Sequence, residues 1–431
     1  MRIYDIIMNK KYGKVLSKEE IIFAVNGFVD GTVADYQMSS LLMAICCKGF
    51  NEQETFDLTE TMLYSGDIID LSEFANFTVD KHSTGGVGDK TSLIISPIVA
   101  SLGGKVAKLS GRGLAHTGGT IDKLESINGF NVNLTREQFI NQVKEIGVAI
   151  VSPTENIVPA DKKIYALRDA TATVDCIPLI AASIMSKKLA SGSKNIVLDV
   201  KYGNGAFMKD EFEAIKLANI MVKIGQHFNR KVTAIITDMN KPLGCAIGNK
   251  LEVQEAIEIL KYNKNNNLRD VCITLASEMI SQLPIDIKNP KEEVQKVLQN
   301  GKAYEKFKEW ITTQGGDITD AKSINNSKYI IEIKSKKEGF LHNISAIDIG
   351  TLALQLGAGR NKKEDSIDYD AGIILKKQCG DFVENGETLC VLYTNKEDFN
   401  EKINIEKYLD IFDIKETEPE KQSPICAIIK W

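Results

Sequence analysis

The chain has 431 residues, of which 43% are hydrophobic and 26% are charged, and its formal net charge at pH 7 is −5. This length predicts two or three domains with an ample core, and the mild acidity without a basic patch argues against nucleic acid as the main partner. The sequence has no apolar run of about 18 residues, no signal-peptide core and no C-x-x-C pair among its eight cysteines, which predicts a cytoplasmic protein with free thiols, no membrane contact and no zinc site.

Residues 1–66 are predicted to be helical. Ser17 with Glu20, and Asn51 with Glu54, have the spacing of a capping box, in which two side chains satisfy the free N–H groups at a helix start. Apolar residues then recur at helical spacing. We therefore expect an all-helical segment at this end of the chain.

Strands and helices alternate from residue 77 onwards. Phe77–Asp80, Lys105–Leu109 and Val148–Val151 are short and apolar, which is typical of buried strands. Helices are predicted at residues 91–102 and 135–146 between them. Such alternation indicates a parallel sheet with covering helices.

A glycine-rich loop joins the first of these strands to the first helix. Gly85, Gly86 and Gly88 allow a tight turn and a close approach to a ligand, and the helix start that follows offers unpaired N–H groups. The glycines alone would equally fit a plain strand-to-helix turn. The loop matches neither G-x-x-x-x-G-K-S/T nor G-x-G-x-x-G, which disfavours a nucleoside triphosphate or NAD as ligand.

Polar residues follow the ends of two predicted parallel strands. Lys81, His82 and Ser83 precede the first glycine-rich loop, and a second glycine-rich segment spans residues 110–125. Because ligands in open α/β sheets bind beyond the carboxyl ends of the strands, both segments are expected to line one cleft. Cations mixed with hydroxyls suit phosphate, although any single hydroxyl could instead cap a turn. The residues of this kind, called the phosphate set below, are Lys81, Ser83, Ser92, Lys108, Ser110 and Thr120.

Residues 160–192 are predicted to be helical again and to pack with residues 1–66 as one discontinuous lobe. Ser183 and Lys187 are four residues apart, so they share one helix face, and Arg168 lies on the neighbouring predicted helix. The sequence favours a binding site over a solvated surface only slightly for these residues. Lys188 is expected to lie on the solvated surface.

The rest of the chain predicts two further parts. Strands at Asn195–Val200 and Val232–Thr237 are each followed by a helix, and residues 268–313 have the pattern of amphipathic helices. Beyond Lys328 the pattern changes to strands with a Gly-rich turn. The strands predicted there are Tyr329–Lys334, Ala371–Lys376, Thr388–Leu392 and Cys426–Lys430.

The fold class is therefore α/β, and we expect three lobes. A discontinuous all-helical lobe comprises residues 1–66 and 160–192. A larger α/β lobe with a mainly parallel central sheet comprises residues 67–159 and 193–327. A C-terminal α+β lobe comprises residues 328–431.

Two segments carry a family resemblance. Residues 80–89 (Asp-Lys-His-Ser-Thr-Gly-Gly-Val-Gly-Asp) and residues 110–125 (Ser-Gly-Arg-Gly-Leu-Ala-His-Thr-Gly-Gly-Thr-Ile-Asp-Lys-Leu-Glu) resemble the pyrimidine-nucleoside and thymidine phosphorylase family. The second string matches the signature of that family along its length. The resemblance covers essentially the whole chain, through Gly357-Ala-Gly-Arg360 to the C-terminal lobe.

This resemblance implies a role for each lobe. The helical lobe would bind the pyrimidine and form the contact of a homodimer, and the α/β lobe would bind phosphate through the phosphate set. His82 would lie between the two sites and act in catalysis with Arg168 and Lys187. The pyrimidine ligands implied, called the base set below, are Arg168, Ser183 and Lys187.

Some members of the resembling family also bind a potassium ion near the hinge between the lobes. Lys90 departs from the threonine expected at its position. The change is tolerable if residue 90 contributes a backbone carbonyl, whereas an inward-pointing ammonium would compete with the ion. The positions that match this site are Gly88, Lys90, Leu243, Ala246 and Glu255.

The reaction implied is reversible phosphorolysis of uridine, thymidine and deoxyuridine to the free base and α-D-(deoxy)ribose 1-phosphate, with phosphate as co-substrate and no organic cofactor. Such a pentosyltransferase serves pyrimidine salvage or breakdown. A thymidine-specific enzyme remains an alternative. Less favoured alternatives are a phosphoribosyltransferase like that for anthranilate, which would need magnesium, and a nucleoside-binding protein without turnover.

Overall fold

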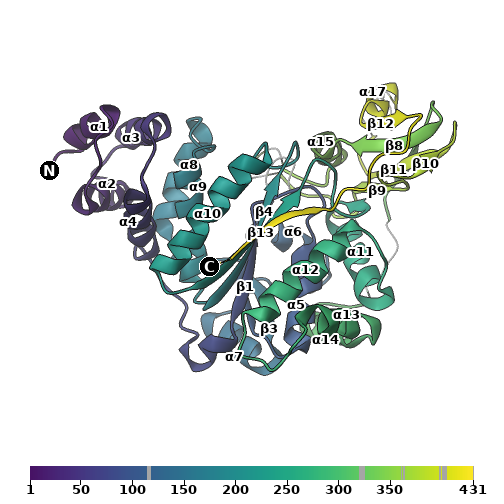
Figure 1. Cartoon of the computed structure of the whole chain (residues 1–431), viewed down its shortest axis with the longest axis horizontal. Helices are drawn as coiled ribbons and strands as arrows, with labels where there is room; N and C mark the ends of the chain where they lie inside the picture. Colours follow the sequence, from purple (N-terminus) through teal and green to yellow (C-terminus); the bar gives the residue numbers. More distant parts are fainter. Residues whose placement is uncertain are drawn as a thin grey trace.

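The computed structural model describes residues 1–113, 118–319, 326–360, 362, 365–397, 399 and 405–430. Figure 1 shows the N-terminal helices at one end of the molecule, a twisted sheet in the middle and the C-terminal strands at the opposite end. The helices and strands therefore follow the predicted class, α/β with a helical part and a C-terminal α+β part.

The N-terminal segment is helical as predicted. Capping boxes form at Ser17 and Glu20 and at Asn51 and Glu54. Helices from the 160–192 region pack against the same apolar core. The helices of this part are α1 (Ile3–Lys11), α2 (Lys18–Asp30), α3 (Asp35–Lys48), α4 (Glu52–Leu63), α8 (Pro159–Ala170) and α9 (Ile177–Ala190).

The central sheet is mainly parallel. Strands β1 (Val79–Ser83), β4 (Asn195–Tyr202) and β5 (Lys231–Asp238) pair in parallel, in that order. Strands β2 (Val106–Leu109) and β3 (Val148–Val151) form a parallel pair of their own. A parallel bridge between Thr78 and Lys105 places β2 beside β1, so the carboxyl ends of β1 and β2 lie at one edge.

One prediction about this sheet is wrong. The sequence assigned Cys426–Lys430 to the C-terminal lobe. Instead, β13 (Ile425–Lys430) pairs antiparallel with β5 and forms the edge of the central sheet. Figure 1 shows the chain returning from the far end of the molecule to reach this place. Ala427 and Ile429 face the core that the helical part shares.

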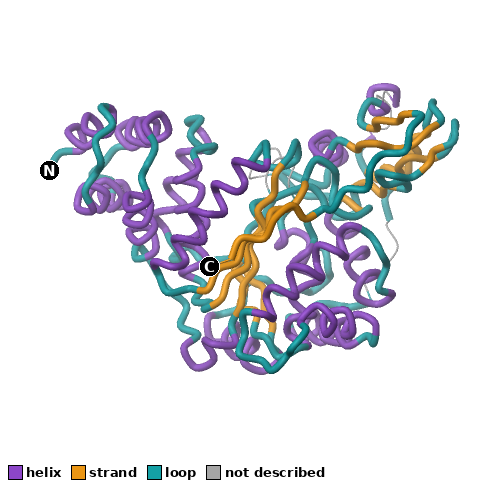
Figure 2. Tube along the Cα trace, viewed as in Figure 1, coloured by secondary structure: helices purple, strands orange, loops and turns teal. Residues whose placement is uncertain are grey.

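Helices cover both faces of the sheet (Figure 2). Alternate residues of β4 point to opposite sides: Ile196 and Leu198 belong to the core with α9 and α10 (Glu211–His227), and Val197 belongs to the core on the other face. The helices of that second face and its surroundings are α5 (Thr91–Ser101), α6 (Thr120–Glu125), α7 (Arg136–Ile146), α11 (Asn249–Tyr262), α12 (Asn267–Ser281), α13 (Pro290–Gln299) and α14 (Lys302–Thr313).

The C-terminal part consists of two antiparallel sheets. The first has the order β6-β9-β11-β7 and the second the order β10-β8-β12. Strand β6 comes from the middle of the chain, so this part is joined to the α/β part through a shared sheet. The elements are β6 (Ala246–Ile247), β7 (Tyr329–Lys334), β8 (Gly339–Ile344), α15 (Ala346–Leu356), β9 (Gly372–Leu375), β10 (Phe382–Val383), β11 (Thr388–Thr394), α17 (Ile405–Leu409) and β12 (Phe412–Lys415).

Among the described residues, no helix is long and apolar enough to cross a membrane.

Candidate functional site

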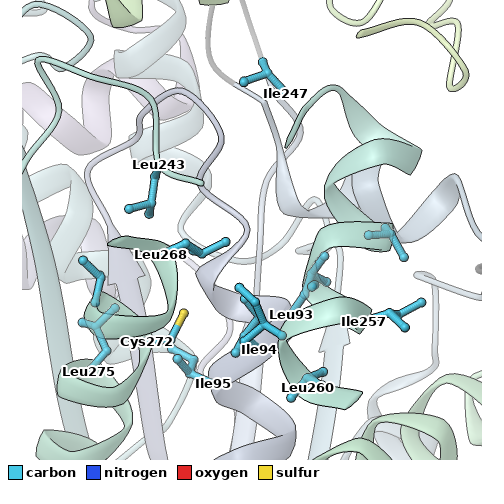
Figure 3. Packing of buried hydrophobic residues seen from close by; sticks show 14 of the residues in the cluster. Leu93, Ile94, Ile95, Leu243, Ile247, Ile257, Leu260, Leu268, Cys272 and Leu275 are labelled. Carbon is cyan, nitrogen blue, oxygen red and sulfur yellow. The ribbon is translucent and has the colours of Figure 1, made fainter. Parts of the chain in front are cut away.

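The first glycine-rich loop runs from the end of β1 to the start of α5, and buried side chains hold that helix in place. Gly88 has a φ of +74°, and a Cβ added there would lie 2.5 Å from the carbonyl oxygen of Leu243. Only glycine meets both conditions without strain. Figure 3 shows the first turn of α5 packed between α11 and α12, through Leu93, Ile94, Ile95, Ile257, Leu260, Leu268, Cys272 and Leu275.

Lys81 lies in a buried network of alternating charges. Its Nζ is 3.1 Å from the Asp199 carboxylate and 3.7 Å from that of Asp89, and it donates to Thr91 Oγ1 at 2.5 Å. Lys201 Nζ is 3.0 Å from Asp199 as well. Burial acts to raise the pKa of Asp89, but Lys81 and Lys201 outweigh it and hold this pKa well below its usual range. The network therefore keeps Lys81 charged beside the loop.

Lys108 belongs to a second buried network, at the neighbouring strand end. Asp80 accepts from Lys188 Nζ at 2.6 Å and from Lys108 Nζ at 3.4 Å, and Lys108 also donates to the backbone oxygen of Lys81. Burial lowers the pKa of Lys108 to about 8, because Asp80 compensates only in part and other lysines are near. For Asp80, burial acts to raise the pKa, but Lys108 and Lys188 outweigh it and lower this pKa. Two cations thus share one carboxylate and leave local positive charge.

The hydroxyls of the phosphate set lie at the ends of the same elements. Ser83 is the last residue of β1, and its Oγ accepts the N–H of Gly85 at 3.1 Å. Ser92 lies in the first turn of α5 and Thr120 is the first residue of α6. Ser110 directly follows β2, and its N–H donates to Val151 O at 3.0 Å. The six residues therefore come from two adjacent strand ends and the helix starts that follow.

The second glycine-rich segment contacts the first. Lys123 on α6 donates to the backbone oxygen of Asp89 at 2.9 Å, which ties the two segments together. A Cβ added at Gly119 would lie 2.0 Å from the N of Gly113, so this segment folds tightly on itself. Residues 114–117 of the family signature, His116 among them, lie outside the described residues.

Ser183 and Lys187 lie together on α9, facing α8. Lys187 Nζ donates to Ser183 Oγ at 2.9 Å and to the Asp161 carboxylate at 2.5 Å. It also lies 5.8 Å from the centre of the Tyr165 ring. Asp161 and Tyr165 were not singled out from the sequence, although both share the α8 face that carries Arg168, at helical spacing.

Arg168 is buried, with 1% of its side chain exposed, so the solvated-surface alternative is wrong for it. Its guanidinium donates to the backbone oxygens of Thr173, Val174 and Leu179 at 2.9–3.2 Å. It also lies 6.0 Å from the centre of the Tyr165 ring, the same ring that Lys187 Nζ approaches to 5.8 Å. Arg168 therefore holds the turn between α8 and α9 and shares one neighbouring ring with Lys187.

Lys188 is also buried, with 3% exposed, so the prediction that it lies on the solvated surface is wrong. Its partner Asp80 lies 108 residues away in the chain, a distance at which sequence spacing carries no contact signal. Asp80, Asp89, Asp199 and Lys201 were likewise missed as site residues. A usable signal was that Asp199 and Lys201 lie toward the carboxyl end of a parallel strand beside β1.

His82 lies on β1 between Lys81 and Ser83 of the phosphate set. Burial, and then the charges of Lys188, Lys108, Lys187 and Lys81 in that order, lower its pKa well below the usual value. Lys187 belongs to the base set, and Lys108 and Lys81 belong to the phosphate set. The imidazole is therefore neutral at neutral pH and lies within the electrostatic reach of both sets.

The five positions implied for potassium do come together, but a lysine occupies their centre. Lys90 Nζ donates to Leu243 O at 3.0 Å, to Ala246 O at 2.6 Å and to Glu255 Oε2 at 2.6 Å. Gly88 packs against the same Leu243 oxygen. The ammonium of Lys90 points inward, so the competing-ammonium alternative is the one that the structure shows. These residues therefore do not fit a potassium ion.

Comparison with known proteins agrees with this arrangement. Three family models match the chain: "Glycosyl transferase family, helical bundle domain" at residues 4–66, "Glycosyl transferase family, a/b domain" at residues 75–304, and "Pyrimidine nucleoside phosphorylase C-terminal domain" at residues 340–409.

Curated relatives include a pyrimidine-nucleoside phosphorylase of Geobacillus stearothermophilus, 50% identical over 402 residues, which covers 92% of this chain and 93% of the relative. One of Bacillus subtilis is 50% identical over 408 residues, with 94% of each covered. Among solved structures, anthranilate phosphoribosyltransferase of Thermus thermophilus matches with a TM-score of 0.57 at 17% identity, covering 72% of this chain and 99% of that one. This last likeness concerns the fold alone.

Proposed function

The chain belongs to the pyrimidine-nucleoside phosphorylase family, and we propose that it catalyses the reversible phosphorolysis of pyrimidine nucleosides to free base and α-D-(deoxy)ribose 1-phosphate. The observation that carries this proposal is the contact between the two sets: Asp80 on β1 accepts from Lys108 of the phosphate set and from Lys188, which follows the base-set residue Lys187 on α9. A nucleoside bound on one side and phosphate on the other would meet there. Phosphate is the co-substrate, and no organic cofactor is needed.

Phosphate would bind at the ends of β1 and β2. Lys81 and Lys108 supply the charge, and the hydroxyls of the phosphate set supply neutral donors. Phosphate oxygens favour this mixture, because charge-assisted hydrogen bonds are roughly twice as strong as neutral ones. The N–H groups at the start of α5 add a positive dipole end. Held in this way, the phosphate would attack C1′ of the sugar with inversion.

The base would bind against α8 and α9. Breaking the bond from C1′ to the base nitrogen leaves negative charge on the pyrimidine, which spreads to its oxygens. Lys187 and Arg168 are the cations near that place, and Ser183 adds a hydroxyl donor. Fixed charges that meet developing charge in a water-excluded site stabilise the transition state most effectively. Lys187 is held by Asp161, so little reorganisation is needed.

His82 would act as a neutral donor. A protonated imidazole would place another positive charge beside a sugar that is itself becoming positive. The surrounding lysines prevent this, because burial and their charges lower the pKa of His82 well below its usual value. One ring N–H remains available to a base oxygen or to phosphate.

The lobes belong to the proposal as well. We assign residues 1–66 and 160–192 to the base-binding lobe, 67–159 and 193–327 to the phosphate-binding lobe, and the rest to the C-terminal lobe, except that β13 joins the central sheet. Because the two half-sites come from different lobes, closure would precede the chemistry.

We further propose that the enzyme is a cytoplasmic homodimer whose contact lies on the N-terminal helices. Tyr4, Tyr12, Tyr36 and Met43 expose 40–75% of their surface there. Clusters of exposed large apolar residues are typical of association surfaces. Light scattering of the purified chain should give twice the mass of one chain, whereas a monomer mass would contradict this part.

Release of free base from uridine, thymidine and cytidine, with and without phosphate, tests the function. We expect phosphate-dependent release from uridine and thymidine, unaffected by removal of magnesium with EDTA. Release from thymidine alone would replace the broad specificity by a thymidine phosphorylase whose pocket rejects the 2′-hydroxyl. A magnesium requirement would point to a phosphoribosyltransferase, and binding without release from a folded protein would contradict an enzyme.

A further inference from the structure

Lys90 is a buried lysine whose hydrogen bonds resemble the coordination of a metal ion. An ammonium has three N–H donors. The Nζ of Lys90 finds three oxygens, two of them backbone carbonyls and one a carboxylate, at 2.6–3.0 Å. Carbonyl and carboxylate oxygens are the donors that hard cations prefer in proteins. Lys90 has 1% of its surface exposed, so water does not share this role.

The carboxylate of this group is itself held in place. Glu255 accepts the N–H groups of Cys245 at 2.8 Å and of Ala246 at 2.9 Å, and the Asn266 side-chain amide at 3.1 Å. Burial acts to lower the pKa of Lys90, but Glu255 outweighs it and raises this pKa. The Lys90 ammonium therefore lies in a fixed cavity of oxygens.

The position of the cation matters for the fold. Lys90 directly precedes α5 and ends the first glycine-rich loop. Leu243 N–H donates to Val87 O at 3.1 Å, so Leu243 contacts the loop through its N–H as well as through the carbonyl that accepts from Lys90. Ala246 begins β6, which belongs to a sheet of the C-terminal part, and Glu255 lies on α11. One charge thus joins the loop at the phosphate set to two other parts of the chain.

We propose that Lys90 is a built-in monovalent cation, which replaces a bound metal ion at this junction. Two consequences follow. The native chain does not need potassium to hold the junction together. Removing the ammonium while leaving an oxygen in its place converts the junction into a metal site. The proposal does not depend on which reaction the enzyme catalyses.

Thermal unfolding in potassium chloride and in choline chloride at equal ionic strength tests the first consequence. The native chain should unfold at the same temperature in both salts. A native chain that is stabilised by potassium, but not by sodium or choline, would overturn the proposal. This measurement needs no variant, so it decides even where a variant fails to fold.

The Lys90→Thr variant tests the second consequence. In choline chloride its unfolding temperature should fall by on the order of 5 °C, because an unpaired Glu255 remains buried. Added potassium should restore part of this loss, since a ligand that binds only the folded state stabilises it. Lys90→Met, which offers no oxygen, should lose stability without recovery by potassium.

Lys10→Thr is the matched control. Lys10 is another buried lysine, 2.6 Å from the Glu54 carboxylate, but with only one carbonyl oxygen at 3.4 Å among its described contacts. It should lose stability without recovery. Binding of thallium(I), a potassium substitute followed by its own NMR signal, should appear in Lys90→Thr and not in the native chain. Bound thallium in the native chain, or no recovery of Lys90→Thr by potassium, would contradict the proposal.

Discussion

Most lysines of the site do not face solvent; they are placed by buried carboxylates. Asp80 holds Lys108 and Lys188, and Asp199 holds Lys81 and Lys201. Such buried pairs cost desolvation energy, so they contribute position more than stability. Each network therefore fixes ammonium groups at a strand end, where a phosphate would need them preorganised.

Replacing Lys187 tests the base set. Lys187→Met should lower kcat by on the order of 100- to 1000-fold, because one donor to the leaving base is lost, and should leave the KM for phosphate nearly unchanged. The control is Lys162→Met on α8, whose lysine is 54% exposed and pairs with Glu155. It should have native activity. Near-native kcat for Lys187→Met would remove Lys187 from the proposed role.

The pKa of Lys108, about 8, predicts a pH dependence. Below pH 8 the free enzyme carries the ammonium, and above it the charge is lost. Phosphate is already a dianion over most of the range from pH 7.5 to 10, so its KM should rise, by about tenfold if one charge-assisted contact of about 1.5 kcal/mol is lost.

Lys108→Arg provides the control for this effect, because arginine stays protonated throughout the range. Its KM for phosphate should be flat with pH, whatever its absolute value. Initial rates at varied phosphate and saturating nucleoside would measure both profiles. A native KM that stays constant between pH 7.5 and 10 would contradict the role given to Lys108.

At the scale of elements, α9 is attached to β1 through a charge rather than through apolar packing alone. Lys188 reaches from α9 to Asp80 on β1, while its neighbour Lys187, a base-set residue, donates to Asp161 on α8. Consecutive residues on one helix therefore serve two purposes: one joins the helical part to the sheet, and the other faces the site.

Neighbouring substitutions on α9 separate these purposes. Lys188→Met leaves Asp80 buried with one weaker partner and should reduce the free energy of unfolding by about 3 kcal/mol. Lys187→Met removes a cation that is 39% exposed, so water can take its place at the Asp161 carboxylate, and the loss should be smaller, about 1 kcal/mol. Urea unfolding of both variants measures the difference. Equal losses would show that the Asp80 link is not what attaches α9.

The elements that the sequence predicts well are those with local signals. The capping boxes at Ser17 and Asn51 start helices where expected, and short apolar runs became β2 and β3. The place of β13 could not be predicted, because an alternating strand does not encode its partner, and β5 lies almost 200 residues earlier in the chain. The burial of Lys188 was missed for the same reason.

At the scale of the molecule, the central sheet separates two apolar cores and carries the site at one edge. One core lies with α9 and α10, and the other lies with α5, α11 and α12. The C-terminal part is tied to the second glycine-rich segment by Arg360, whose guanidinium is 2.9 Å from the Asp122 carboxylate. The C-terminal part therefore also reaches the edge of the sheet that carries the site.

Strand β13 closes the open edge of this sheet. A chain that ends at residue 423 should expose the backbone donors and acceptors of β5 and should aggregate or unfold at a lower temperature. The matched pair is Ile429→Ser, which points toward the core, and Ile428→Ser, which is 41% exposed. Size-exclusion chromatography and thermal unfolding should show aggregation or a lower unfolding temperature for the truncated chain and for Ile429→Ser. Ile428→Ser should behave like the native chain. A native-like truncated chain would mean that the edge needs no cover.

The most direct test of the proposed reaction follows the sugar product by phosphorus NMR. Uridine and phosphate are incubated with the native chain, and uracil is measured in the same sample. We predict uracil and α-ribose 1-phosphate in equal amounts, and neither without phosphate. Free ribose in place of the sugar phosphate, or uracil released without phosphate, would contradict direct attack by phosphate at the site between the two lysine networks.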